Sequence, residues 1–255
     1  MGSTSLEPTS AGTTESTDTT DATGSTDTTD SGETTSTAGD ESSSSTGGPG
    51  FVLCDDSDAD LRACYDFADV GGGVLDDLSM YGNDGEVGAV GEEAGPFGGA
   101  VRVSETAEIS VPDSESLDVL GPATLEAWVH FDSLPAMGDR VGILDNDGQY
   151  SMIVFGNGGL RCNGGGISAF AAVPTEEWVH LACRFDGDEM SAWVDGVEVE
   201  SETGGAPFNV DATNPMSLGD SSPAFEEPMD GLLAAVRVWS VARSDDDIVD
   251  AAAVR

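Results

Sequence analysis

The sequence predicts an all-β domain, a jelly-roll sandwich of two sheets, preceded by a disordered N-terminal tail. From Phe51 onward, apolar and polar residues alternate with period two in about a dozen short runs. Gly, Asp, Asn and Pro separate these runs, as expected of turns between strands. Residues 1–50, in contrast, contain no aromatic residue and almost no large aliphatic one.

The first 50 residues are predicted to be an acidic, Ser/Thr/Asp-rich linker. Residues 16–21 (STDTTD) recur at 25–30, and the segment has too few apolar side chains to offset the entropy of ordering. Such a tract is typical of a spacer. The chain breakers at residues 47–50 (GGPG) mark the boundary, so the folded domain is predicted to be residues 51–255.

Two segments carry the strand pattern most clearly. In 125–131 the residues Leu125, Ala127, Val129 and Phe131 alternate with polar or larger ones, and 179–185 repeats this pattern. Further strands are predicted at 99–104, 106–111, 141–145, 150–155, 158–162, 166–173, 189–195, 197–202, 214–219 and 231–240. Asp195-Gly196 predicts a hairpin, because Gly tolerates positive φ. One helix is predicted over 245–252, because Ser244 can cap its N-terminus and the aspartates at 245–247 suit the positive end of its dipole.

The net charge of the chain limits the classes of molecule that it is expected to bind. The formal net charge is -41, with 49 Asp+Glu against 8 Lys+Arg, and every cation is an arginine. Such a field repels phosphate backbones, so nucleic acid is excluded as a partner, and anionic membrane surfaces are disfavoured. Divalent cations, calcium above all, suit hard carboxylate oxygens. The alternative is that the acidity serves solubility alone.

Four cysteines predict two disulfides and an oxidising compartment. None of the cysteines forms a CxxC pair, so the sequence does not support a zinc site. Of three connectivities, Cys54–Cys64 is favoured because the two are close in sequence. Cys162–Cys183 is favoured because both residues fall on strands expected to be neighbours.

The N-terminal residues have neither the basic start nor the apolar core of a signal peptide, and no stretch approaches the ~20 apolar residues of a membrane span. We expect an extracellular or cell-surface protein whose signal peptide, with a possible lipid-anchored cysteine, preceded Leu6.

Several segments occur in the order of a known family. They are Cys64–Phe67 followed by Asp76–Gly85, then Ala123–Val129, Glu177–Cys183, Ala192–Val197 and Met229–Trp239. Over about residues 62–252 the chain resembles laminin-G-like jelly-roll domains of the concanavalin-like group found in bacterial surface proteins. The resemblance implies a β-sandwich with a non-catalytic recognition role.

The resemblance also bears on calcium. Where the family's closing strand often has an acidic pair, this chain has Ala234-Ala235, which weakens a calcium site at that position. Asp77, Asn83 and Asp230 remain as candidate oxygen ligands. The acidic run at 55–60 fails the EF-hand pattern and is interpreted as a solvated loop.

Trp128, Trp178 and Trp193 are interpreted as packing residues rather than sugar platforms. His130 and His180 are interpreted as structural residues on the polar faces of their strands.

Three functions compete. The favoured one is a non-catalytic module that binds a glycan or a cell-surface protein. The alternatives are an architectural stalk without a specific ligand, and a glycoside hydrolase, for which the acids nearest to a catalytic pattern are Glu198, Glu200 and Glu202. A binding face is expected at the long or glycine-rich loops 81–97, 132–140 and 203–213.

Overall fold

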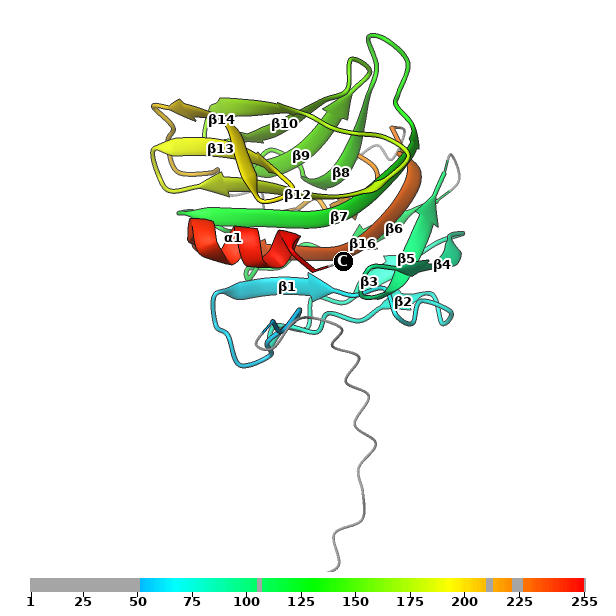
Figure 1. The fold of residues 1–255 in the computed structure, drawn as a ribbon. Coiled ribbons are helices and arrows are strands. Elements are labelled where there is room, and N and C mark those ends of the chain that lie inside the picture. The colour runs from blue at the N-terminus through cyan, green and yellow to red at the C-terminus, as the bar shows by residue number, and fades with distance from the viewer. Residues whose placement is uncertain (1–50, 105–106, 210–212, 222–226, 255) are drawn as a thin grey trace, which may run out of the picture. The chain divides into compact units, whose positions relative to one another are not determined.

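The computed structural model describes residues 51–104, 107–209, 213–221 and 227–254, so the predicted tail lies outside the described residues. The described residues form two antiparallel sheets and one C-terminal helix (Figure 1). The predicted all-β sandwich is therefore confirmed.

The first sheet, called sheet A here, has the order β14-β13-β12-β7-β16-β5-β4, and β1 pairs with the C-terminal half of β16. Its strands are β14 (Val197–Thr203), β13 (Glu189–Val194), β12 (Trp178–Phe185), β7 (Ala123–Ser133), β16 (Asp230–Trp239), β5 (Gly98–Val103), β4 (Gly91–Gly95) and β1 (Leu61–Tyr65).

The second sheet, sheet B, has the order β11-β10-β9-β8-β15-β6-β3-β2. Its strands are β11 (Ile167–Ala172), β10 (Gly159–Gly164), β9 (Tyr150–Phe155), β8 (Arg140–Asn146), β15 (Met216–Leu218), β6 (Ile109–Val111), β3 (Gly85–Val87) and β2 (Val74–Leu75). The sequence did not predict β1 to β4. Strands β2 and β3 have only two and three residues, and β4 is exposed along nearly its whole length.

The core lies between the two sheets. The predicted inward residues of β7, Leu125, Ala127, Val129 and Phe131, are buried there. Their partners from sheet B include Ile143 and Met152. Period-two alternation thus places one face of each long strand in a shared apolar layer, which is the main source of stability of a sandwich.

The outer face of sheet A differs from the prediction. His180 was expected on a polar face, but it is fully buried, as are Glu126 and Trp128 beside it. Helix α1 (Asp245–Ala252) and the segment that begins at Phe51 cover this face: Ile248 packs on Ala182 and Trp193, and Phe51 joins the cluster around Trp128. Sheet A therefore packs on both faces, and alternation alone identified only one of them.

Local turn and cap signals are confirmed. Asp195 and Gly196 both have positive φ (49° and 75°) in the β13–β14 hairpin, as a tight two-residue turn requires. Ser244 caps α1 and exchanges hydrogen bonds with Asp247 in a capping box. Trp128 and Trp193 are buried packing residues, as predicted.

The two disulfides are Cys54–Cys64 and Cys162–Cys183, the pairing chosen from the sequence. The reason given for the second pair was wrong. Cys162 lies on β10 of sheet B and Cys183 on β12 of sheet A, so this disulfide joins the two sheets across the core instead of two neighbouring strands.

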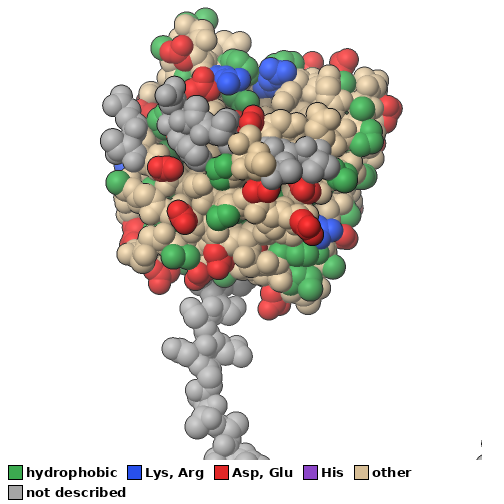
Figure 2. Space-filling model, turned by 180° about the vertical axis from the view of Figure 1, so that it is seen from behind, with side chains coloured by type: hydrophobic (Ala, Val, Ile, Leu, Met, Phe, Trp, Pro, Cys, Tyr) green, Lys and Arg blue, Asp and Glu red, His purple; other side chains and the backbone are tan. Residues whose placement is uncertain are grey.

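Acidic side chains are spread over the face seen from behind, where basic ones are few (Figure 2). In the described part of the chain, no helix combines the length and the apolar character that crossing a bilayer requires.

Candidate functional site

The candidate calcium ligands do not meet at one place. Asp77 and Asn83 share a loop beside β1, whereas Asp230 begins β16 and accepts a hydrogen bond from Ser133 Oγ (2.7 Å). In the pairing of β1 with β16, Cys64 lies opposite Arg237. Asp230 is seven residues from Arg237 along β16, so Asp230 and the Asp77 loop beside Cys64 are roughly 20 Å apart along the strand. Among the described residues, no group of three or more His, Cys, Asp or Glu side chains could hold a metal ion.

The carboxylate of Asp77 is occupied by protein donors. It accepts hydrogen bonds from the backbone N–H groups of Cys64, Ser79 and Asn83 (2.8–2.9 Å) and from Ser79 Oγ (2.7 Å). The Asn83 side chain donates to Arg62 O (2.7 Å) and accepts from Ser116 Oγ. These contacts are typical of loop-forming residues. They do not test calcium binding, which stays a prediction.

The alanine pair at 234–235 lies on the covered outer face of sheet A. Both side chains are buried against Phe97, Trp128 and Val254. Ala235 has positive φ (50°), at a bulge in the pairing of β16 with β7. A carboxylate at either position would be buried in this apolar cluster, which explains physically why alanine is accommodated here.

A buried charge cluster lies next to that apolar patch. Glu126 is fully buried, and it pairs with Arg237 and accepts hydrogen bonds from Arg243 Nη1 (2.9 and 3.1 Å). Burial by itself would raise the pKa of Glu126, but the two arginines outweigh it and hold that pKa below its usual range. Burial lowers the pKa of the neighbouring His180 to about 4, so this imidazole is neutral at pH 7. Because Glu126 is closed off from solvent, this cluster is suited to a structural role.

Two of the exposed acids of β14, Glu198 and Glu200, have separate structural partners. Glu198 pairs with Arg184 (3.2 Å), and Glu200 Oε2 accepts from the backbone N–H of Phe170 on β11 (3.0 Å). A bulge in the pairing of β14 with β13 falls between the partners of these two acids. The Glu200 contact ties the edge strand of sheet A to the edge strand of sheet B.

A groove lies beside that junction, and we call it the Phe170 groove. It has a volume of about 690 Å³, within the usual range of ligand sites. Its lining comprises Met137, Asp139, Phe155, Asn157, Phe170 and Val199, with the backbone of Gly156, Gly158 and Gly159 and the neighbouring residues Gly138, Ala171 and Ala172. Residues 137–139 belong to loop 132–140, one of the three loops where a binding face was expected.

Glycine allows the groove to form. A Cβ on Gly156 would lie 2.1 Å from Ala136 O, so only glycine permits loop 132–140 to approach the β9–β10 turn this closely. The Gly156 N–H donates to Asp139 O (3.0 Å), which holds the loop in place. The loop is thus fixed by the strand turn beneath it.

The groove presents apolar side chains to solvent. Met137 is 81% exposed, Val199 52% and Phe170 45%. No other aromatic side chain in the described residues is among the exposed large apolar residues. Asn157 and Asp139 are exposed beside them, and Oδ1 of Asn157 accepts a hydrogen bond from the backbone N–H of Gly159 (3.0 Å). An apolar platform with an amide and a carboxylate at its margin can hold a ligand that is apolar on one face and polar at its edge.

The other two predicted loops contribute no described residue to the lining of the Phe170 groove. Residues 81–97 contain β3 and β4. In 203–213, Phe208 is buried and stacks on Phe185 with ring centroids 4.8 Å apart, while residues 210–212 lie outside the described part. Phe170 was missed, although its sequence held a signal: in β11 the buried residues are Ala169 and Ala171, so an aromatic residue between them must point outward.

Comparisons with known proteins agree with this architecture. A family model described as the concanavalin A-like lectin/glucanases superfamily matches residues 103–249, more than half of the chain. No curated protein sequence matches the chain.

Solved structures resemble this domain at low sequence identity. Domain 4 of AbnA, a GH43 extracellular arabinanase from Geobacillus stearothermophilus, in complex with arabinotriose, is 20% identical with a TM-score of 0.60, over 75% of this chain and 98% of that one. The binding domain of Paraclostridial Mosquitocidal Protein 1 is 13% identical with a TM-score of 0.62, over 76% of this chain and 52% of that one. Trypanosoma rangeli sialidase in complex with sialic acid is 15% identical with a TM-score of 0.59, over 77% of this chain and 33% of that one. The last two comparisons span about half or less of those chains, and at these identities they establish the fold alone.

Proposed function

This chain belongs to the concanavalin A-like lectin/glucanase superfamily, and on that premise we propose that it is a non-catalytic recognition module that binds a glycan in the Phe170 groove. The observation that carries the proposal is the exposure of Phe170, Met137 and Val199 together in one groove. A sugar ring has an apolar C–H face and a rim of hydroxyl groups. The apolar side chains suit the face, and Asp139 and Asn157 suit the hydroxyl groups.

A binding role is favoured over hydrolysis by the number of acids at the groove. Hydrolysis by a retaining mechanism uses two carboxylates ~5 Å apart. Among the described residues that line the groove, Asp139 is the one carboxylate. Glu200, the nearest acid of β14, accepts a backbone hydrogen bond. A binding role is compatible with this fold, since one similar domain was solved with arabinotriose and another is described as the binding domain of a mosquitocidal protein.

The setting that we propose is outside the cell. Two disulfides with no free cysteine are consistent with an extracellular or secreted protein. A glycan at a cell surface is the partner we favour over a surface protein, because the groove is small compared with a standard protein–protein interface.

A glycan array tests this proposal, followed by calorimetry of the best ligand. Phe170→Ala should weaken binding about tenfold, through the loss of ~1–2 kcal/mol of apolar contact. Met137→Ala should weaken it less, and Met80→Ala, which removes a similarly exposed methionine elsewhere (57% exposed), should have no effect. Thermal melts of all variants control for folding.

Absence of a ligand across a broad array would favour the architectural alternative. Release of reducing sugar from a bound polysaccharide would instead favour the hydrolase. A parallel titration with calcium and chelator tests whether binding needs a metal.

A further inference from the structure

Met137 is the most exposed of the large apolar residues in the described part of the chain, at 81%. It lies in a tight turn, in which the Asp139 N–H donates to Ala136 O (2.9 Å) and Gly138 has a φ of 100°. A positive φ at the third position of a four-residue turn favours glycine, and the residue before it, Met137, occupies the corner. The exposure of the Met137 thioether therefore follows from the backbone of the turn.

The chain on either side of the turn is anchored. Leu134, near the start of the loop, packs against the core, and the Asp139 carbonyl accepts from the Gly156 N–H (3.0 Å). These contacts hold the turn beside the Phe170 groove, whose lining includes Met137 together with Phe170. The sulfur of Met137 is thus kept in solvent at the proposed binding site.

Few other side chains in the described residues compete with Met137 for an oxidant. Both cysteine pairs are disulfides, and no free cysteine is present. Four methionines are at most 2% exposed, namely Met152, Met190, Met216 and Met229. Met80 is 57% exposed, but it does not line the groove. Because an oxidant must reach the sulfur atom, Met137 is the thioether of the groove that oxidation would alter first.

The reaction of a thioether with a peroxide is a two-electron oxidation. A lone pair of the sulfur attacks one peroxide oxygen, so that an S–O bond forms and the O–O bond breaks. With hydrogen peroxide the other oxygen takes the proton of the transferred hydroxyl and leaves as water. The sulfur is oxidised and the peroxide is reduced. The product is a sulfoxide, which is polar where the methionine side chain was flexible and apolar.

We infer that Met137 is an oxidation site through which peroxide weakens binding at the Phe170 groove. The inference rests on the proposed function, in which the C–H face of a sugar ring lies against Met137, Phe170 and Val199. A sulfoxide oxygen loses its hydration when a sugar covers it, so the oxidised side chain favours water over the ligand. Affinity should fall about threefold to fivefold through the lost apolar contact, and reduction of the sulfoxide should restore it.

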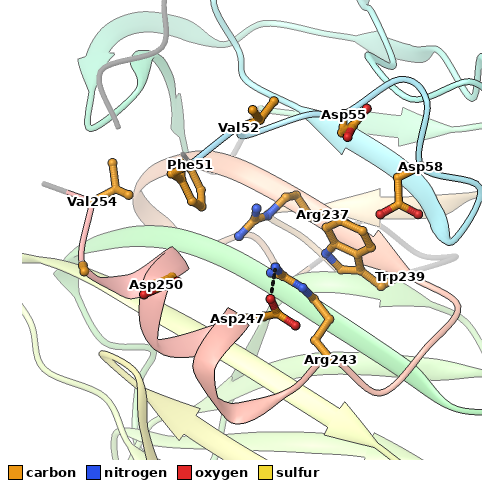
Figure 3. Close-up of a pocket in the computed structure, with 11 residues that line it drawn as sticks. Phe51, Val52, Asp55, Asp58, Arg237, Trp239, Arg243, Asp247, Asp250 and Val254 are labelled. Atoms are coloured by element: carbon orange, nitrogen blue, oxygen red, sulfur yellow. Dashed lines mark ion pairs between the residues drawn. The ribbon is translucent and has the colours of Figure 1, made fainter. Parts of the chain in front are cut away.

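A second cavity of the described residues offers a contrast. It has a volume of about 570 Å³, and residues from the N-terminal segment, the end of β16 and helix α1 line it (Figure 3). None of the described residues in this lining is a methionine. A ligand bound there would keep its affinity after peroxide treatment, so sensitivity to peroxide distinguishes the Phe170 groove from this cavity.

Limited treatment of the full chain with hydrogen peroxide, with both disulfides intact, tests the inference through three measurements. Peptide mass spectrometry should show that Met137 gains one oxygen atom faster than the buried methionines, and saturating glycan should slow this gain at Met137 but not at Met80. Calorimetry with the best glycan from the array should show the loss of affinity. Treatment with the two reductases specific for the sulfoxide epimers should reverse that loss.

Two leucine variants locate the effect. Met137→Leu has no thioether in the groove, so its affinity should be the same before and after peroxide treatment. Met80→Leu is the matched control, and it should bind glycan and lose affinity on oxidation as the unaltered chain does. Thermal melts before and after treatment control for folding.

Three results would overturn the inference while leaving the proposed function intact. Met137 is oxidised no faster than the buried methionines, the chain oxidised at Met137 binds glycan as tightly as the untreated chain, or Met137→Leu loses affinity on treatment to the same extent. Absence of glycan binding by the untreated chain is a different result: it overturns the proposed function, and the inference falls with it.

Discussion

His180 should make the stability of this domain fall steeply as the pH drops below about 6.5. Its side chain is fully buried on the covered face of sheet A, with the ring centroid 5.5 Å from that of Trp128. Within the described part of the chain, neither ring nitrogen of His180 has a hydrogen-bond partner. Burial lowers the pKa of His180 to about 4; Glu126 and Asp195 oppose this shift, and Arg237 and Arg243 add to it.

The direction of this pH dependence follows from the pH at which the unfolded and the folded chain each protonate His180. The unfolded chain binds the proton near its ordinary pKa of about 6.5, whereas the folded chain binds it only near pH 4. The stability is therefore complete above about pH 6.5 and is lost as the pH falls through the folded value. Linkage gives a loss of about 2 kcal/mol at pH 5 and about 3 kcal/mol at pH 4.

Urea unfolding followed by circular dichroism, at several pH values between 7.5 and 4, measures this loss. His180→Leu keeps an apolar side chain of similar size and cannot titrate. The many surface carboxylates of this acidic chain are common to both proteins, so their contribution largely cancels in the difference between the two. The difference should change by about 3 kcal/mol from pH 7.5 to pH 4 in favour of the variant. Parallel stability curves for the two proteins would refute the reasoning.

Three further predictions concern the packing. Glu126→Ala should cost about 3–5 kcal/mol of unfolding free energy, because it leaves two arginines without their buried partner, and chemical denaturation measures it. Replacing Cys162 and Cys183 together by Ser should cost about 3 kcal/mol, as expected for a closed loop of about 20 residues; an unchanged denaturation midpoint would contradict the cross-sheet disulfide. Gly156→Ala should displace loop 132–140 and weaken glycan binding, whereas Gly72→Ala, where a Cβ meets nothing within 4 Å, should not; calorimetry compares the two.

The features that could be predicted are those determined by residues close to one another in the sequence. Leu125, Ala127 and Val129 alternate because a strand points successive side chains to opposite faces, and one face must be buried. Asp195-Gly196 predicted its hairpin, and Ser244 its helix cap, because each motif satisfies its own backbone within a few residues. For the same reason the cysteine pair Cys54–Cys64 was accessible to prediction.

The features that escaped prediction depend on contacts between remote segments. Glu126 and His180 alternate like solvent-facing residues, and only the docking of α1 and of the segment from Phe51 makes them buried. The Phe170 groove exists because the edge strands β11 and β14 meet, tied by Glu200, near a loop from a third region. No local sequence pattern predicts these contacts between remote segments.

The central claim is that the Phe170 groove is where a glycan binds. Its most direct test is a titration of isotope-labelled protein with the best glycan from the array, followed by amide chemical shifts. Saturable shifts should concentrate at residues 137–139, 156–159 and 170–172. Saturable shifts confined to other surfaces, with these segments unchanged, would contradict the account.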